Sequence, residues 1–424
     1  MKEGRSLELH ENRISAENAL LVSVDTGDFD AEISLNELEE LAKTAGAEVV
    51  GKIIQKRPHA EAATFVGYGK LAEIIMFCEA QNVDLLIFDS ELTPSQQRNL
   101  EKLTKVRVID RTMLILDIFA ARARSSEGKL QVELAQLKYS LPRLAGQGQA
   151  LSRLGGGIGT RGPGETKLES DKRHIRRRIQ KLEEELKGLE KRRTLQRNRR
   201  RKDGVVSIAI VGYTNAGKST LMNTLTDAGV LAENKLFATL DPTARALILP
   251  DGRNVMLIDT VGLIRRLPHK LVEAFKSTLE AAAEASLILN VCDASDEHCN
   301  EHLDVTKQLL NELGCENTPV ISVMNKCDLV GNIYEMPTFG NTVLISALEG
   351  KGIDSLLNAI MKAIPVTKRE VCFLIPYKDG AQAAFIRNEC KVLKEDYRED
   401  GLFLRVIADL SLIDRLRDLL VDDT

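Results

Sequence analysis

The feature that most constrains the fold is a glycine-rich loop between a predicted strand and a predicted helix. Val205–Val211 is an apolar run that leads into residues 212–219, Gly-Tyr-Thr-Asn-Ala-Gly-Lys-Ser, and the helical Leu221–Leu225 follows. In this context the G-x-x-x-x-G-K-S spacing predicts a P-loop, whose backbone amides converge on phosphates. Lys218 is then expected to reach the β- and γ-phosphates, and the Ser219 hydroxyl to bind Mg²⁺.

A second phosphate-side motif follows the apolar strand 255–258. Asp259 ends this strand, and Thr-Val-Gly262 comes directly after it. The Asp259 carboxylate is expected to hold the Mg²⁺ shell through water, and the Gly262 amide to meet the γ-phosphate. Between the two motifs, Thr239 and Thr243 are both available to complete the Mg²⁺ coordination when the γ-phosphate is present.

Two further motifs indicate which base is bound. Val320–Met324 is followed by Asn325-Lys326-Cys-Asp328, and Val343–Ile345 is followed by Ser346-Ala347. A carboxylate at Asp328 accepts from the two N–H donors on the edge of guanine, which adenine lacks. Left buried without those donors, it would reject adenine. The Ser346-Ala347 turn can place a backbone amide on the guanine oxygen. Four motifs in order, each at the end of a strand, predict a guanine-nucleotide site.

Residues 111–203 have a different, helical character. Two apolar series recur there at steps of three and four: Leu130, Leu134, Leu137 and Leu141, then Ile175, Ile179, Leu182, Leu186 and Leu189. Each series is a single seam that needs a partner, so we predict that the two helices pack as an antiparallel hairpin. Leu144–Thr166 lies between them and is too rich in glycine to continue either helix, which predicts a mobile tip.

Charge is concentrated in the second of these helices. Residues 171–202 contain fifteen Lys or Arg and five Asp or Glu, a local charge of +10, whereas the whole chain carries −4 and the remainder therefore −14. A mildly acidic chain with one basic segment indicates a localised contact with a polyanion. The alternative is a solvated, charged helix.

At 424 residues the chain is too long for one core. Strand–helix alternation over residues 20–110 predicts a small parallel α/β domain. After Pro365, strands at Val371–Ile375 and Leu402–Ile407 alternate with helices at 380–390 and 411–420. We predict an α/β protein of four parts: an N-terminal α/β domain (1–110), a helical hairpin arm (111–203) with its glycine-rich tip at 144–166, a P-loop GTPase domain (204–366) and a C-terminal α+β domain (367–424).

This combination of segments resembles the HflX family of ribosome-associated GTPases, within the Obg-related P-loop GTPases. The resemblance extends over nearly the whole chain. The segments that carry it are Asp110–Thr112, Leu114–Phe119, Glu127–Leu137, Gly162–Glu169 and Leu236–Asp241.

The resemblance implies a GTP-hydrolysing factor that binds the large ribosomal subunit and its 23S-type rRNA. Such a factor splits or rescues stalled 70S ribosomes, with the hairpin tip near the peptidyl-transferase region. An alternative is a large-subunit assembly factor in which GTP only gates binding to rRNA, and a third is a signalling GTPase with protein partners alone. The expected substrate is GTP, with Mg²⁺ as cofactor. We expect a cytoplasmic monomer with no DNA partner and no stable membrane insertion.

The family pattern assigns the switch Mg²⁺ ligand to Thr239. The predicted catalytic residues are Lys218, Thr239 and Gly262, and the predicted metal ligands are Ser219, Thr239 and, through water, Asp259. The predicted nucleotide contacts are Gly212, Asn215, Ala216, Gly217, Lys218, Ser219, Thr220, Phe237, Ala238, Thr239, Leu240, Asp241, Asp259, Thr260, Val261, Gly262, Asn325, Lys326, Asp328, Ser346 and Ala347. The predicted RNA contacts are Arg143, Arg153, Arg161, Lys167, Arg173 and Arg177.

Leu263 stands where many GTPases carry a glutamine that orients water. Leucine cannot form a hydrogen bond through its side chain, which predicts slow intrinsic hydrolysis and stimulation by the ribosome. Arg265 and Arg266 are candidates for a transition-state role in cis or, equally, for a surface contact with RNA. His298 and His302 have the i, i+4 spacing of zinc ligands, but no third ligand is evident nearby, so we predict an exposed helix face.

Overall fold

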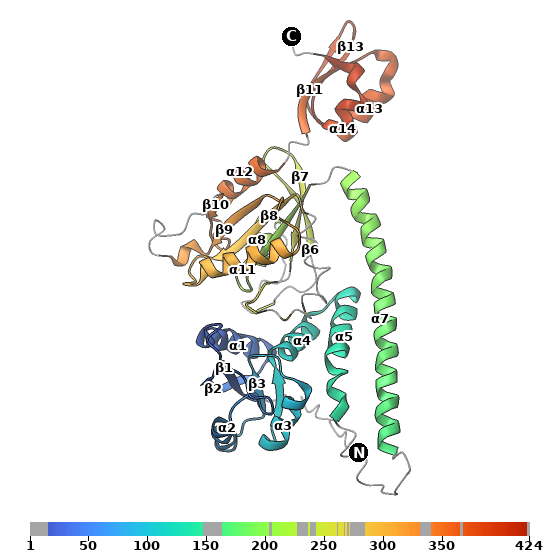
Figure 1. Ribbon diagram of the computed structural model, residues 1–424. Coiled ribbons are helices and arrows are strands. Elements are labelled where there is room, and N and C mark those ends of the chain that lie inside the picture. The colour runs from blue at the N-terminus through green and yellow to red at the C-terminus, as the bar shows by residue number, and fades with distance from the viewer. Residues whose placement is uncertain are drawn as a thin grey trace, which may run out of the picture.

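The computed structural model contains three separate sheets, which follow one another along the molecule (Figure 1). The structure describes residues 16–146, 163–202, 206–226, 236–237, 243–260, 262–266, 268, 271, 285–330, 341–364 and 368–421. The first two sheets are mainly or wholly parallel and carry helices, so the predicted α/β class is confirmed. The predicted boundaries between the four domains stay a prediction.

The N-terminal domain is a parallel sheet with helices on both faces. Its strands are β1 (Asn18–Asp25), β2 (Glu48–Lys56), β3 (Leu85–Phe88) and β4 (Arg107–Asp110), in the order β2-β1-β3-β4. Its helices are α1 (Ala31–Ala45), α2 (Tyr68–Gln81), α3 (Pro94–Thr104) and α4 (Arg111–Arg122). The two central strands are buried along nearly their whole length because helices cover both of their faces.

Local signals in the sequence fix the ends of α1. The Asp30 side chain accepts from the amides of Glu32 and Ile33, and so caps the start of the helix. Gly46 ends it with φ 92°, a left-handed conformation that glycine adopts without steric cost. This helix and α4 share one core, whereas buried residues of α2 and α3 belong to another.

The arm consists of α5 (Ser126–Ser140) and α7 (Pro163–Lys202), which lie side by side (Figure 1). Three ion pairs join them: Glu127–Arg193, Glu133–Arg178 and Lys138–Glu183. The start of α5, at Glu127, pairs with the far part of α7, at Arg193, whereas Glu133 and Lys138 pair with the earlier Arg178 and Glu183, so the two helices are antiparallel.

Two details of the arm differ from the prediction. The leucine series of α5 is half-buried, and a second face of the helix carries the buried Val132, Ala135 and Tyr139. These three residues join the core that contains α4, because α5 lies between α4 and α7. The helix α7 begins at Pro163, inside the segment assigned to the tip, since proline fits the first turn of a helix.

The predicted RNA contacts lie in different surroundings. Arg173 and Arg177 are exposed on α7. Arg143 has another role: its guanidinium donates to Asp110 (3.2 Å), to the Leu92 carbonyl (2.7 Å) and to the Tyr139 carbonyl (3.0 Å). These bonds tie the end of α5 to the N-terminal domain, and we withdraw Arg143 from the RNA-binding set. Arg153, Arg161 and the Lys167 side chain lie outside the described residues, as does most of the predicted tip.

The GTPase domain is a six-stranded sheet with the order β10-β9-β8-β5-β7-β6. The strands are β5 (Val206–Gly212), β6 (Thr243–Ile248), β7 (Asn254–Asp259), β8 (Leu287–Asp293), β9 (Val320–Asn325) and β10 (Thr342–Leu344). Only β6 is antiparallel to its neighbour among these strands. The described helices are α8 (Lys218–Thr226), α11 (Cys299–Glu312) and α12 (Ile353–Ala363). The phosphate and base motifs therefore meet at one edge of the sheet.

The C-terminal domain contains two strands that the sequence did not predict. Its sheet has the order β12-β13-β11-β14, with strands β11 (Lys368–Ile375), β12 (Lys391–Arg398), β13 (Gly401–Asp409) and β14 (Leu420–Val421). The longer of the unpredicted strands, β12, is an exposed edge strand whose sequence is mainly charged and lacks an apolar alternation. Helix α13 (Gly380–Glu389) lies as predicted, but α14 (Leu410–Arg415) is shorter than the predicted helix.

The N-terminal and GTPase domains share a hydrophobic core. Phe237, Leu263 and Ile264 of the GTPase domain pack with Leu35 and Phe119 of the N-terminal domain. Buried charges lie beside this core. Arg111 is 2% exposed and donates to Asp89 (2.9 Å), to Glu37 and to the Arg265 carbonyl (3.0 Å).

In the part of the chain that the structure describes, no helix has both the length and the apolar composition needed to span a membrane.

Replacing Arg111 by methionine is expected to destabilise the N-terminal domain by about 3–5 kcal/mol, because Glu37 and Asp89 would lose their buried partner. The measurement is urea unfolding followed by hydrogen exchange of the β1 and β3 amides. The matched control is Arg107→Met, which breaks an exposed ion pair with Glu17 and is expected to cost less than about 1 kcal/mol. Equal effects of the two substitutions would contradict this account.

Candidate active site

The P-loop joins β5 to α8 and needs glycine at both of its ends. A Cβ on Gly212 would lie 2.0 Å from the Val291 carbonyl oxygen, and one on Gly217 would lie 2.2 Å from Asn325 Nδ2. Both glycines also have positive φ, 148° and 89°. The glycine spacing is therefore required by contacts with β8 and with the base motif, as well as by the loop conformation.

Lys218 lies inside the curve of this loop. Its ammonium donates to the carbonyls of Gly212 (3.0 Å) and Tyr213 (2.7 Å). Burial lowers the pKa of Lys218 to about 8, although the nearby Asp259 raises it. A buried ammonium whose pKa lies near neutral is stabilised when a polyanion arrives beside it.

The two residues expected to hold Mg²⁺ lie together. Ser219 Oγ donates to Asp259 Oδ2 at 2.9 Å, and Asp259 is fully buried at the end of β7. A hydroxyl and a carboxylate are the oxygen ligands that Mg²⁺ prefers. Thr239, the third predicted ligand, lies outside the described residues, and Thr243 is the first residue of β6.

Asn325 connects the phosphate and base sides of the site. Its side-chain amide donates to the Ala216 carbonyl (2.9 Å), and its Oδ1 accepts from the Ala347 amide (2.9 Å). The Ala347 amide, one of those in the turn predicted to contact the guanine oxygen, thus donates to Asn325 in the structure. Ser346 is fully buried, and its Oγ accepts from the Glu349 amide.

Two charged residues of the base motif, Lys326 and Asp328, differ from each other in their surroundings. Lys326 forms an ion pair (2.6 Å) with Asp293, the last residue of β8, which was not predicted as a site residue. Asp328 is exposed, so the expectation of a buried carboxylate is wrong. Discrimination against adenine must therefore arise when the base itself removes water from Asp328.

Several other predicted contacts are now placed. The Thr260 hydroxyl donates to the Ile210 carbonyl (2.8 Å), between β7 and β5. Phe237 is buried and stacks edge-on against Phe119 of α4 with centroids 4.7 Å apart, so its side chain belongs to the interdomain core. Asn215 is exposed, with φ 61°, whereas Ser219 and Thr220 are half-buried. Ala238, Leu240, Asp241 and Val261 lie outside the described residues.

The two arginines after Gly262 contact the N-terminal domain or α11. Arg266 donates to Asp89 (2.8 Å) and Ser90 (3.0 Å) and lies 3.7 Å above the Phe29 ring. Arg265 forms an ion pair with Glu301 of α11 (2.6 Å). The sequence did not predict these protein contacts, and the roles of the two arginines in the transition state or in RNA binding stay predictions. Leu263 is buried, and its backbone pairs with Gly212 and Thr214.

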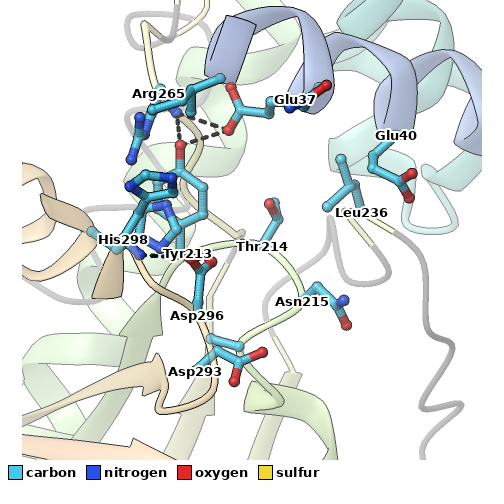
Figure 2. Close-up of a pocket in the computed structure, with 14 residues that line it drawn as sticks. Glu37, Glu40, Tyr213, Thr214, Asn215, Leu236, Arg265, Asp293, Asp296 and His298 are labelled. Atoms are coloured by element: carbon cyan, nitrogen blue, oxygen red, sulfur yellow. Dashed lines mark hydrogen bonds and ion pairs between the residues drawn. The ribbon is translucent and has the colours of Figure 1, made fainter. Parts of the chain in front are cut away.

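A pocket of about 270 Å³ lies between α1 and the P-loop (Figure 2). Tyr213 stands on one wall, where its hydroxyl donates to Glu37 (2.5 Å) and accepts from the Arg265 amide. Burial raises the pKa of Tyr213, so the hydroxyl stays protonated. His302 is buried and stacks on the Tyr213 ring at 3.8 Å. The prediction of an exposed face is therefore wrong for His302, and burial lowers its pKa.

Neither Glu37 nor Tyr213 was predicted as a residue of the site. They are 176 residues apart, and no local pattern in the sequence indicates that they meet. Asp293 carried a signal, because it ends the apolar strand β8 at the same edge of the sheet as the P-loop.

Models of known families match three consecutive parts of the chain. Residues 32–120 match "GTP-binding GTPase N-terminal", 122–200 match "GTP-binding GTPase Middle Region" and 207–326 match "50S ribosome-binding GTPase". A relative from Caldanaerobacter subterraneus subsp. tengcongensis, "GTPase HflX", is 52% identical over 407 residues, which cover 96% of this chain and 94% of that protein. The chain belongs to the HflX family of GTPases. It is a GTP-hydrolysing enzyme.

A second HflX relative agrees with this assignment. "GTPase HflX" of Escherichia coli K12 is 42% identical over 393 residues, 91% of this chain and 92% of that protein. A GTP-binding protein from Sulfolobus solfataricus, solved with GDP, is 27% identical, with a TM-score of 0.43, and the match covers 82% of this chain and 98% of that one.

Nucleotide binding is expected to take up a proton at alkaline pH. With a pKa of about 8, Lys218 is largely neutral in the free protein at about pH 9. Bound phosphates favour its protonated form, so the side chain takes up a proton when the nucleotide binds. Calorimetry of GDP binding in buffers of different ionisation enthalpy measures this uptake, which should vanish at about pH 6. In Lys218→Arg the cation stays protonated throughout, so a pH-independent result is expected. Equal proton uptake at the two pH values in the unsubstituted protein would contradict the account.

The substitution D328N is expected to exchange guanine for xanthine. Asparagine offers one donor and one acceptor where aspartate offers acceptors alone, and this matches the carbonyl and N–H edge of xanthine. GTP affinity should fall by about 100-fold or more, with a gain for xanthosine triphosphate. Competition against a fluorescent nucleotide measures both. The control D304N neutralises an exposed carboxylate of α11 and should change neither.

Proposed function

We propose that the chain binds the large ribosomal subunit in its GTP-bound form and splits or rescues stalled 70S ribosomes. GTP hydrolysis would then release the protein from the subunit. One observation carries the proposal. The GTPase domain shares a hydrophobic core with the N-terminal domain and α5, and the long arm that includes α5 presents exposed arginines. The match of residues 207–326 to "50S ribosome-binding GTPase" supports the same partner.

The arm provides the proposed rRNA contacts. Arg173 and Arg177 are exposed on α7, and the helix as a whole carries an excess of positive charge. Cations spaced along an exposed helix suit the phosphates of folded RNA. We propose that Arg153, Arg161 and Lys167 extend this contact toward the peptidyl-transferase region, with 23S-type rRNA as the ligand.

Mg²⁺ is the proposed cofactor. Ser219 and, through water, Asp259 would hold it, and their separation of 2.9 Å suits a shared cation. Thr239 would complete the set. Bound Mg²⁺ neutralises the charge that develops on the phosphates during hydrolysis. We further propose a cytoplasmic monomer with no DNA partner and no stable membrane insertion.

The alternative function is assembly of the large subunit, with GTP only gating attachment to immature rRNA. The same arm favours it, because contact with RNA is common to both functions. Sedimentation of intact 70S ribosomes after incubation with the protein, with GTP or a non-hydrolysable analogue, distinguishes them. Separated subunits are the expected result. Ribosomes that stay intact, with binding restricted to precursor particles, would favour assembly.

Reversing the charges at Arg173 and Arg177 to glutamate is expected to weaken ribosome binding at every salt concentration. It should also lower the slope of log affinity against log salt by about 0.7–0.9 for each phosphate that the arm no longer neutralises. GTP affinity should not change, because both residues lie on the arm. The control is the double substitution of Lys307 and Lys362, on the GTPase domain, to glutamate. Equally weakened binding in the two variants would contradict the proposed surface.

A further inference from the structure

Hydrolysis of GTP needs a group that holds the attacking water, and Leu263 cannot supply it. Its side chain is 4% exposed and packs in the core shared with the N-terminal domain. Its backbone is fixed as well: the Leu263 amide donates to the Gly212 carbonyl (3.1 Å), and its carbonyl accepts from the Thr214 amide (2.8 Å). Within the described part of this chain, such a polar group has to come from another residue near the P-loop.

Thr214, the third residue of the P-loop, has the required group. The residue is 7% exposed, and its Oγ1 is buried without a hydrogen-bond partner among the described residues. Figure 2 shows its side chain rising from the loop into the pocket between α1 and the P-loop. Burying a hydroxyl without a partner is unfavourable, so such a group marks a place where a ligand or water is bound during function.

Three neighbouring polar groups of the pocket already have hydrogen-bond or ion-pair partners. Glu37 accepts from Arg111, from the Tyr213 hydroxyl and from the Arg265 amide. The Tyr213 hydroxyl both donates and accepts. Asp293 is paired with Lys326. A water molecule that approached the phosphates from this side would meet in Thr214 a hydroxyl whose donor and acceptor are both unused among the described residues.

Three groups of the reaction converge at this point. A Cβ built on Gly262 would lie 2.6 Å from Thr214 Cγ2 and 3.2 Å from Lys218 Nζ. Gly262 is the residue whose amide is expected to meet the γ-phosphate, and Lys218 is the expected phosphate-binding cation. The methyl group of Thr214 faces Gly262 here, and a rotation about Cα–Cβ to another staggered rotamer carries Oγ1 to that side.

We propose that the Thr214 hydroxyl positions the attacking water for GTP hydrolysis, in the role that a glutamine fills in many GTPases. Oγ1 accepts a hydrogen bond from the water, and its O–H donates a hydrogen bond to a γ-phosphate oxygen. The water oxygen forms a bond to the γ-phosphorus, and the bond from that phosphorus to the β–γ bridging oxygen breaks. GDP leaves with the electron pair, and the proton of the water passes to the released phosphate. Threonine keeps its own proton count unchanged.

The test compares Thr214→Val with Thr214→Ser in the full-length protein with GTP and Mg²⁺. Valine keeps the shape and loses the hydroxyl, whereas serine keeps the hydroxyl. Single-turnover hydrolysis, GTP affinity and thermal midpoint are measured for each, with and without ribosomes. Valine should lower the hydrolysis rate by about 100-fold, the lower end of the loss seen when one hydrogen-bonding group positioned for the transition state is removed. Serine should retain most of the rate, and GTP affinity should stay unchanged in both.

Stability separates this role from a structural one. Because valine removes a buried hydroxyl that has no partner among the described residues, Thr214→Val should melt at the same temperature as the unsubstituted protein or higher, while its hydrolysis falls. Hydrolysis by Thr214→Val at the unsubstituted rate would overturn the proposal, as would an equally slow rate in Thr214→Ser. If the valine variant does not fold, Thr214→Ala provides the same comparison.

Discussion

The arrangement of this molecule depends on a set of buried charges between the N-terminal domain and the segment that follows Gly262. Asp89 is fully buried and accepts from Arg111 of its own domain and from Arg266 of the GTPase domain. Glu37 joins Arg111 to Tyr213 of the P-loop. Buried charges are stable only when they are paired, so each domain completes the pairs of the other. The nucleotide site is therefore built partly by the N-terminal domain.

This contact explains why a leucine stands beside Gly262. Leu263 packs in the interdomain core together with Phe237, and the backbone pairing of Leu263 with the P-loop fixes where the Gly262 amide lies. An apolar residue at this position contributes packing that a glutamine could not. Other residues must then hold the attacking water, and Thr214 of the P-loop is a described residue whose buried hydroxyl has no hydrogen-bond partner among the described residues.

The parts of the site that could be predicted from sequence were those encoded locally. The P-loop, Asp259 and the Asn325–Asp328 motif each follow an apolar strand, and their spacing alone places them at one edge of the sheet. The contacts of Glu37, Tyr213, Arg265 and Arg266 could not be predicted, because residues far apart in sequence meet there without a local pattern. The strand β12 was missed for another reason: an exposed edge strand has no apolar alternation. The arm was predicted as a pair of helices, but the buried face of α5 depends on α4, which the leucine spacing does not reveal.

The most direct test of the central claim is hydrogen exchange at the Leu263 and Arg265 amides. The account predicts that both are protected, since they donate to the Gly212 carbonyl and to the Tyr213 hydroxyl and Glu37. Exchange at Arg265 should accelerate in Glu37→Gln and stay unchanged in Glu39→Gln, which alters an outward ion pair on the same helix. Rapid exchange of both amides in the unsubstituted protein, or equal acceleration in the two variants, would contradict the claim that the N-terminal domain holds this segment in place.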